Sequence, residues 1–181
     1  MDENKIILVD IDNVLWDLLT PWVNWINWQQ NLSVYPEDCV EWNIRTLFPT
    51  LKPEQIFGPL KEADFWNTVT PFTDAQEIIP EIQKHGYQVK IVSATSCSTG
   101  IIKIPKLLKA FPTIDKSDII LCEEKQFIRG KYMIDDNSKN LTEREFPILF
   151  NSFHNRFEVV PSYYKRASDW YDIYKIIVEN K

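Results

Sequence analysis

An apolar run near the start of the chain ends in two carboxylates, and this feature most constrains the fold. Residues 5–9 are Lys-Ile-Ile-Leu-Val, and Asp10, Ile11, Asp12 and Asn13 follow directly. A continuous apolar run of this kind is typical of a strand buried on both faces of a parallel sheet. Open α/β sheets bind ligands at the carboxyl ends of such strands. We therefore predict an α/β protein with Asp10 and Asp12 at the functional edge of its sheet.

Other polar residues lie at or near the ends of later apolar runs. Ser93 ends a second run, Asp135 and Asp136 end a third, and Lys125 lies ten residues before Asp135. Each signal alone has a simpler explanation, because Asp and Ser commonly begin turns or helices and most lysines are solvated. Their shared placement at strand ends favours one catalytic site over several unrelated turns.

The order of the remaining segments predicts a Rossmann-like parallel sheet with helices on both faces. Further strands are expected at residues 89–93, 119–122, 132–135 and 148–150. Helices are expected at residues 15–28, 75–85, 103–111 and 169–178. Prolines divide the segment after the first strand into short helical pieces. Residues 16–72 are therefore expected to form a small helical cap, with residues 1–15 and 73–181 forming the core.

Composition limits the classes of partner. The net charge of −6 and the pI near 5.0 make a polymeric nucleic acid a poor ligand. A small phosphorylated substrate is still compatible with this negative charge, because a metal ion and one lysine can make the electrostatic potential positive at the binding site. No apolar run is long enough to span a bilayer, and the three cysteines form no metal or disulfide pattern. We expect a cytoplasmic protein with no membrane partner.

Hydrolysis of a phosphate ester explains two carboxylates that lie one residue apart. Asp10 could attack phosphorus, and Asp12 could protonate the leaving oxygen and later accept a proton from water. Several carboxylates in one pocket, with Asp136 nearby, need a cation that prefers oxygen ligands. Mg²⁺ is the expected cofactor.

The whole pattern resembles the haloacid dehalogenase-like phosphohydrolases, and within them the 5′(3′)-deoxyribonucleotidase family. The resemblance runs along nearly the whole chain and rests on residues 10–17, Phe65 and Trp66 before residues 69–71, Ser93, Lys125, residues 134–136, residues 148–150, His154 and Asn155, and Asp169 and Trp170. It implies a Rossmann-like core, a helical cap, Mg²⁺, and hydrolysis of nucleoside monophosphates, usually deoxypyrimidine ones.

The resemblance also implies roles at the metal site. By position, Asp10 is the nucleophile and a metal ligand, and Asp136 is a metal ligand. Asp12 is the acid and base, and its backbone carbonyl oxygen binds the metal. Asp135 takes a place that related motifs often give to Gly. We expect it to contact the metal ligands without binding the metal itself.

Substrate contacts follow in the same way. Ser93, with Ala94 beside it, and Lys125 are expected to hold the phosphate, and Lys125 is counted with the catalytic residues. The candidate contacts to the base are Trp16, Trp22, Trp42, Phe65 and Trp66, of which Trp42 and Phe65 are the expected ones. Packing inside the cap is the alternative for each of these two aromatic side chains.

Two positions depart from the family pattern. Asn13 stands where the family usually has Gly, so the loop after the nucleophile is expected to differ if it needs a positive φ. Leu18 stands where the family commonly stacks an aromatic ring on the base. His154 is expected to order a loop, because Asp12 already supplies the acid.

Alternatives to a nucleoside monophosphatase stay open at this point. They are a phosphatase of another small ester, a phosphotransferase, and a nucleotide-binding protein without turnover. An intact Asp12 argues against the last, since a binding protein has no need of an acid. The sequence is compatible with a monomer or a homodimer.

Overall fold

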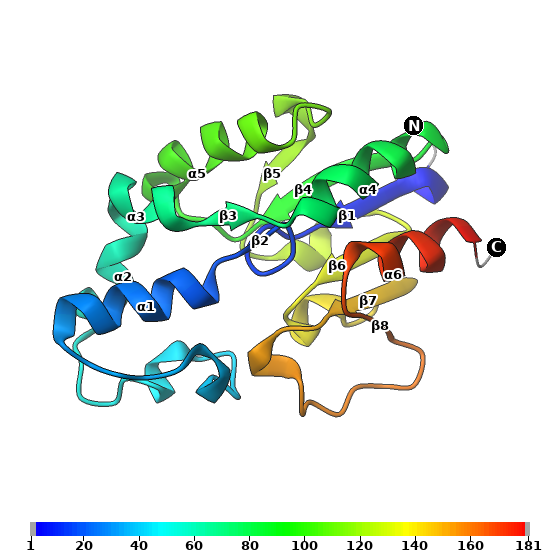
Figure 1. The fold of residues 1–181 in the computed structure, drawn as a ribbon. Coiled ribbons are helices and arrows are strands. Elements are labelled where there is room, and N and C mark those ends of the chain that lie inside the picture. Colours follow the sequence, from blue (N-terminus) through cyan, green and yellow to red (C-terminus); the bar gives the residue numbers. More distant parts are fainter. Residues whose placement is uncertain (1–2, 180–181) are drawn as a thin grey trace.

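The protein is described by a computed structural model that covers residues 3–179. Within these residues lies a six-stranded sheet with the order β5-β4-β1-β6-β7-β8, and every pairing in it is parallel (Figure 1). The strands are β1 (Ile6–Val9), β4 (Gln88–Ser93), β5 (Ile119–Leu121), β6 (Tyr132–Asp135), β7 (Phe146–Phe150) and β8 (Lys165–Ala167). The predicted parallel sheet is confirmed.

The chain changes direction across the sheet at β1. From β1 it runs to β4 and β5 on one side, and it then returns to β6, β7 and β8 on the other. The backbone N–H of Asp10 donates to the carbonyl of Ile134 at 2.9 Å, so the loop after β1 leaves beside the end of β6. Such a switch in strand order opens a crevice at the carboxyl ends of the strands, where ligands bind.

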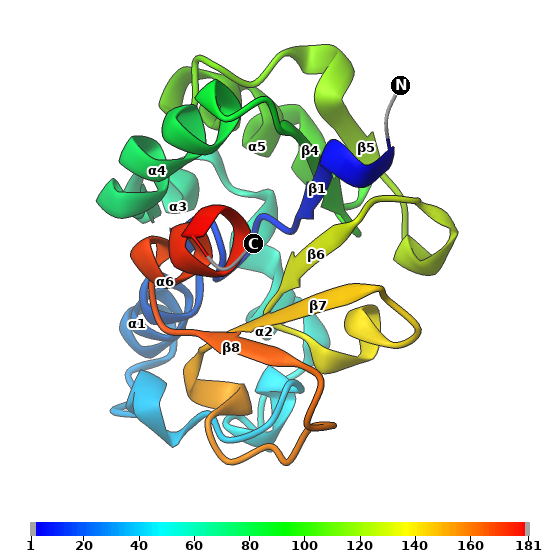
Figure 2. The same cartoon turned by 90° about the vertical axis from the view of Figure 1, so that its right-hand side faces the viewer.

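Alternate residues of β1 face opposite layers. Ile7 and Val9 pack with α4 (Thr73–Lys84), α5 (Cys97–Ala110) and α6 (Trp170–Tyr174), which lie on one side of the sheet (Figure 2). Ile6 and Leu8 join a second cluster with Leu141, which belongs to the 3-10 helix η7 (Ser138–Leu141). The second face is thus covered by short 3-10 helices and loops rather than by long α-helices. Both faces are buried, which explains the uninterrupted apolar run in β1.

A helical segment is inserted between β1 and β4. Its elements are α1 (Leu19–Gln30), η2 (Pro36–Asp38), η3 (Ile44–Thr46), α2 (Pro53–Phe57), η4 (Gly58–Lys61) and α3 (Ala63–Thr68). They enclose a separate apolar cluster that includes Val23, Ile26, Phe48 and Ile56. The short strands β2 (Trp16–Asp17) and β3 (Thr70–Pro71) pair antiparallel and bring the two ends of the segment together. The division into a cap and a core stays a prediction.

Two expected helices differ from the structure at their N-termini. The helix expected from Leu15 starts only at Leu19, because Trp16 and Asp17 are held in the β2–β3 pair. The helix α5 starts earlier than expected, because the Ser96 side chain accepts a hydrogen bond from the backbone N–H of Thr99 and caps it. In the described part of the chain, no helix combines the length and apolar character that a membrane crossing requires.

Candidate active site

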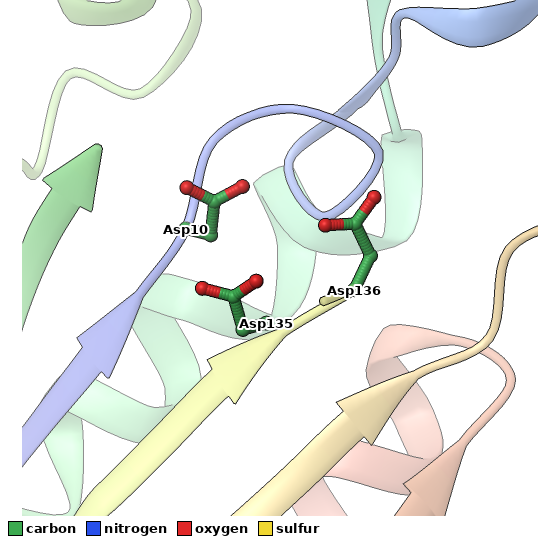
Figure 3. A group of neighbouring side chains, drawn as sticks. All are labelled: Asp10, Asp135 and Asp136. Atoms are coloured by element: carbon green, nitrogen blue, oxygen red, sulfur yellow. The ribbon is translucent and has the colours of Figure 1, made fainter. Parts of the chain in front are cut away.

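Three buried carboxylates meet at the carboxyl ends of two neighbouring strands. Asp10 follows β1, Asp135 is the last residue of β6, and Asp136 follows it (Figure 3). One oxygen from each carboxylate lies within 4.8 Å of the others. Because β1 and β6 are parallel and adjacent, their ends bring together residues that are far apart in the sequence. The structure therefore places Asp10, Asp135 and Asp136 in one cluster.

Lys125 is the counter-charge of this cluster. Its Nζ donates to Oδ1 of Asp10 and, at 2.8 Å, to Oδ2 of Asp135. Burial alone would lower the pKa of Lys125, but the two carboxylates outweigh burial and raise this pKa above its usual range. The guanidinium of Arg144 donates to the backbone carbonyls of Lys125 and Ile128 and so holds the 3-10 helix η6 (Lys125–Phe127) in place.

The hydrogen bonds of Asp135 and Asp136 differ. Both oxygens of Asp135 accept hydrogen bonds, from Lys125, from Nδ2 of Asn140 at 3.0 and 3.1 Å, and from the backbone N–H of Asn137 at 2.9 Å. Oδ2 of Asp136 accepts from Asn13 at 2.9 Å, whereas its buried Oδ1 has no hydrogen-bond partner within residues 3–179. Asp136 thus keeps an oxygen free for a ligand, and Asp135 is occupied in holding Lys125.

The electrostatics of the cluster favour a bound cation. Burial raises the pKa of Asp10 to about 6, although the charge of Lys125 opposes this shift. Burial also raises the pKa of Asp136 well above its usual range, and the carboxylates of Asp10 and Asp135 add to the shift. A buried carboxylate oxygen without a partner and a set of converging oxygen donors fit a hard divalent ion such as Mg²⁺.

Backbone contacts fix the position of Asp136. Its carbonyl oxygen accepts a hydrogen bond of 2.8 Å from Nδ2 of Asn155 and lies 3.1 Å from Nε2 of His154. Nδ2 of Asn155 also donates to the carbonyl of Phe150 at 2.8 Å. His154 therefore orders the loop beside Asp136, as the sequence suggested.

Asp12 is not part of the carboxylate cluster, and its side chain has other partners. Its Oδ1 accepts from the indole N–H of Trp16 at 3.0 Å, and its Oδ2 pairs with Nζ of Lys103 at 2.5 Å. Nζ of Lys103 also lies 2.6 Å from Oγ1 of Thr95 and 3.5 Å from Oγ of Ser93. A second lysine thus joins the loop after β1 to the loop after β4.

Lys103 was not predicted from the sequence. It comes from α5, and only 1% of it is exposed. Gly100, Lys103 and Leu107 are the buried residues of this helix, and they are three or four positions apart. A lysine within the apolar stripe of a helix was therefore the available signal, because an uncompensated ammonium is rarely buried.

Asp10, Asp12, Lys103 and Lys125 line one cavity of about 280 Å³. Its polar wall includes the expected residues Asp10, Asp12, Ser93 and Lys125, and the expected residue Ala94 also lines the cavity. Its apolar wall comes from the inserted segment and consists of Leu18, Trp42, Leu60 and Trp66. Asp136 lines an adjacent hollow that Trp42 and His154 also border. A larger hollow of about 560 Å³ lies beside α1, but the buried charges gather in the smaller cavity, which we take as the candidate active site.

The two expected base contacts have different surroundings. Trp42 is 54% exposed, lines the cavity and lies edge-on to the His154 ring at a centroid distance of 5.0 Å. Phe65 is fully buried, with its ring centroid 5.7 Å from Trp25 and 5.5 Å from Trp66. The expectation that Phe65 contacts the substrate is therefore wrong, because its ring is packed inside the inserted segment. The neighbouring residue, Trp66, reaches the cavity instead.

The loop after the nucleophile keeps a left-handed turn despite the departure at Asn13. Asn13 has a φ of +56°, a conformation that Asn adopts more readily than most residues with a side chain. The loop therefore does not need the Gly of the family pattern. The positive φ that was in question for an Asn is present here, and the Asn13 side chain adds contacts that a Gly could not make.

The fold is similar to that of solved haloacid dehalogenase-like proteins. A haloacid dehalogenase-like family protein from Streptococcus pneumoniae superposes with a TM-score of 0.63 at 13% identity, covering 97% of this chain and 99% of that chain. A hydrolase of the same family from Deinococcus radiodurans, solved with bound phosphate and sodium, gives a TM-score of 0.61 at 12% identity, covering 99% and 97%. These neighbours confirm the fold.

Sequence similarity defines the family more closely. Residues 4–181 match the family described as 5′ nucleotidase, deoxy (pyrimidine), cytosolic type C protein, and the chain belongs to this family. A 5′(3′)-deoxyribonucleotidase of Bacillus subtilis (strain 168) is 30% identical over 172 residues, covering 93% of this chain and 96% of the relative. The protein is thus a nucleotidase, a class of phosphoric monoester hydrolase, as the sequence predicted.

Proposed function

We propose that this protein hydrolyses deoxyribonucleoside 5′-monophosphates through an aspartyl-phosphate on Asp10, with Mg²⁺ as its cofactor. The observation that carries the proposal is that Asp10 and Lys125 line the same cavity as the apolar side chains of Leu18, Trp42, Leu60 and Trp66. A phosphate fits the polar wall, and a nucleobase fits the side formed by Leu18, Trp42 and Trp66. The activity named for the B. subtilis relative supports the same substrate class.

The first step needs an ionised Asp10. Because its pKa is raised only to about 6, Asp10 is mainly ionised at neutral pH, and Lys125 stabilises that charge. A carboxylate oxygen of Asp10 attacks phosphorus, and the bond between phosphorus and the ester oxygen breaks. The ammonium of Lys125 and a hydrogen bond from the hydroxyl of Ser93 stabilise the negative charge on the phosphoryl oxygens.

Asp12 serves as the acid and base. In its protonated form Asp12 gives a proton to the departing sugar oxygen, and the carboxylate that results, which Lys103 and Trp16 stabilise, then accepts a proton from the water that attacks phosphorus, so the acid is regenerated. The second step releases inorganic phosphate and restores the Asp10 carboxylate. Lys103 and Trp16 hold the Asp12 carboxylate at the cavity wall, so Asp12 is oriented before substrate binds.

The metal assignment rests on the donor set. Asp10, Asp136 and the backbone carbonyl of Asp12 would hold Mg²⁺, whose charge lowers the repulsion between the phosphate dianion and Asp10. The free Oδ1 of Asp136 supports this choice, and the hydrogen bonds of Asp135 support its role as the residue that holds Lys125.

Residues 16–72 act as the cap in this proposal. Their end next to the core supplies the apolar side of the cavity through Leu18, Trp42, Leu60 and Trp66. The pairing of β2 with β3 would be the hinge between cap and core. Cys39, Cys97 and Cys122 are free thiols, which agrees with the expected cytoplasmic location.

A phosphate-release screen tests the proposal. The substrates are deoxyribonucleoside and ribonucleoside 5′-monophosphates, the corresponding 3′-monophosphates, sugar phosphates and p-nitrophenyl phosphate, each with Mg²⁺ or with EDTA. At least one deoxyribonucleotide should exceed every sugar phosphate in kcat/KM by about tenfold or more, the worth of one base stacking contact. If sugar phosphates are turned over as well as nucleotides, the nucleotide assignment fails and a phosphatase of another small ester takes its place.

A further inference from the structure

One side chain connects the candidate metal ligand to the start of the inserted helical segment. Nδ2 of Asn13 donates to Oδ2 of Asp136 at 2.9 Å. Oδ1 of the same amide accepts from the backbone N–H groups of Leu18 at 3.1 Å and Leu19 at 3.0 Å. The orientation of the amide follows from its partners, because a carboxylate oxygen only accepts and a backbone N–H only donates. Asn13 therefore uses both ends of its amide at once.

Both ends of the Asn13 amide contact groups that otherwise lack a hydrogen-bond partner or a fixed orientation. Leu18 and Leu19 begin α1, where backbone N–H groups have no acceptor inside the helix. Asn13 supplies that acceptor from outside the helix. At the other end, the hydrogen bond to Oδ2 fixes the Asp136 carboxylate while Oδ1 stays free. Groups that orient a metal ligand in this way affect metal affinity strongly.

The same segment shapes the substrate cavity. Leu18 lines the cavity that contains Asp10 and Asp12, and it directly follows the β2–β3 pair. One amide therefore connects the Asp136 carboxylate to the backbone of a residue that forms the apolar wall. The left-handed backbone of Asn13, with its φ of +56°, places the side chain between the two partners.

We propose that Asn13 is a positioning residue that couples metal binding at Asp136 to the start of the cap at Leu18 and Leu19. This inference rests on the proposed function, since it takes Asp136 as a ligand of Mg²⁺. Binding of Mg²⁺ stabilises the Asp136 carboxylate in the conformation that accepts from Asn13, and it thereby stabilises the first turn of α1. By linkage, order in the first turn of α1 raises the affinity for Mg²⁺ by the same factor.

The substitution Asn13→Gly separates this role from that of a turn residue. Glycine adopts a positive φ without strain, so the loop keeps its course while all three side-chain hydrogen bonds are lost. The matched control is Asn31→Gly. Asn31 also has a positive φ, of +53°, but it is exposed at the opposite end of α1. The two variants make the same chemical change in the same backbone conformation.

Two measurements on the purified chain decide the question. The first is the Mg²⁺ dissociation constant by calorimetry. The second is the amide hydrogen exchange of Leu18 and Leu19 by NMR, with and without Mg²⁺. In the parent and in Asn31→Gly, Mg²⁺ should slow exchange at both amides. In Asn13→Gly, the two amides should exchange faster and respond little to Mg²⁺, and the dissociation constant should rise about 10-fold to 100-fold.

The outcomes distinguish this inference from the proposed function. If Asn13→Gly binds Mg²⁺ as tightly as the parent, or if Mg²⁺ still protects Leu18 and Leu19 in that variant, the coupling is absent and Asn13 is only a turn residue. If the parent itself binds no Mg²⁺, the metal assignment of Asp136 fails, and the coupling fails with it. If Asn31→Gly weakens Mg²⁺ binding as much as Asn13→Gly, the effect comes from the flexibility of glycine and the inference is wrong.

Discussion

Lys103 and Asp12 form an ion pair at 2.5 Å although they lie 91 residues apart in the sequence. The pair connects α5 to the loop after β1, at the wall of the candidate active site. It gives the proposed acid and base a fixed orientation, and the indole N–H of Trp16 holds the second oxygen of Asp12. The chemistry proposed for Asp12 therefore depends on a lysine outside the expected motifs.

Replacing Lys103 tests this dependence. Lys103→Met keeps the aliphatic length but removes the ammonium, so Asp12 loses the partner of its Oδ2. We expect kcat for a nucleoside monophosphate to fall about 100-fold, within the usual contribution of a positioned acid. The loss should be much smaller for p-nitrophenyl phosphate, whose leaving group needs little protonation. Steady-state kinetics with both substrates gives the comparison.

Lys109→Met is the control for this variant, because Lys109 is an exposed lysine of the same helix. It should match the parent with both substrates. Equal losses for the nucleotide and for p-nitrophenyl phosphate in Lys103→Met would show that Lys103 supports the fold or the phosphate site rather than Asp12.

The effect of Mg²⁺ on stability should depend on pH. Burial raises the folded-state pKa of Asp10 to about 6 and that of Asp136 well above its usual range. The unfolded values lie near 3.9, so the stability that Asp10 contributes to the metal-free protein is lost as pH rises through about 6, and the contribution of Asp136 is also lost with rising pH. Metal binding needs the ionised carboxylates. The increase in Tm on adding Mg²⁺ should therefore be small at pH 5 and larger at pH 8.

Thermal unfolding in EDTA and in Mg²⁺ at several pH values measures this effect. The same series also tests the cofactor, because chelation should stop phosphate release and added Mg²⁺ should restore it. A Tm increase that is equal at pH 5 and pH 8 would contradict the proposed titration of Asp10 and Asp136. Full activity after exhaustive chelation would show that neither Asp10 nor Asp136 acts as a ligand of a required metal ion.

Substitutions of two aromatic side chains separate base contact from packing. Trp42 is exposed at the cavity, so Trp42→Ala should raise KM for a nucleotide about tenfold and leave p-nitrophenyl phosphate hydrolysis nearly unchanged. Phe65 is fully buried, so Phe65→Ala should destabilise the protein by about 3–5 kcal/mol and reduce activity toward both substrates. Kinetics and thermal unfolding of both variants provide the data. An unchanged nucleotide KM in Trp42→Ala would exclude this residue as a base contact.

The sheet and the carboxylate cluster were predictable for a physical reason. The strands before Asp10 and at Asp135 are fully buried, and the strand that ends at Ser93 is buried except for its half-buried Gln88 and Lys90. Apolar runs of this kind predict parallel strands in the interior of a sheet. Once those strands are parallel, their carboxyl ends lie at one edge of the sheet. The convergence of Asp10 and Asp136 followed from topology, without any knowledge of side-chain contacts.

The missed features depend on contacts that periodicity does not encode. Lys103 lies on the buried stripe of α5, where its role depends on Asp12, a residue of a distant loop. Phe65 and Trp66 are adjacent in α3, and only their packing shows that Trp66 reaches the cavity while Phe65 does not. The late start of α1 follows from the pairing of β2 with β3, which is a nonlocal interaction.

Phosphate release by Asp10→Asn tests the central claim most directly. The amide is nearly isosteric with the carboxylate but cannot form an acyl-phosphate, so kcat for the best nucleotide should fall at least about a thousandfold. The metal-free Tm of the variant should stay close to that of the parent, because Lys125 keeps its ion pair with Asp135. Activity within tenfold of the parent, in a folded variant, would contradict covalent catalysis through Asp10.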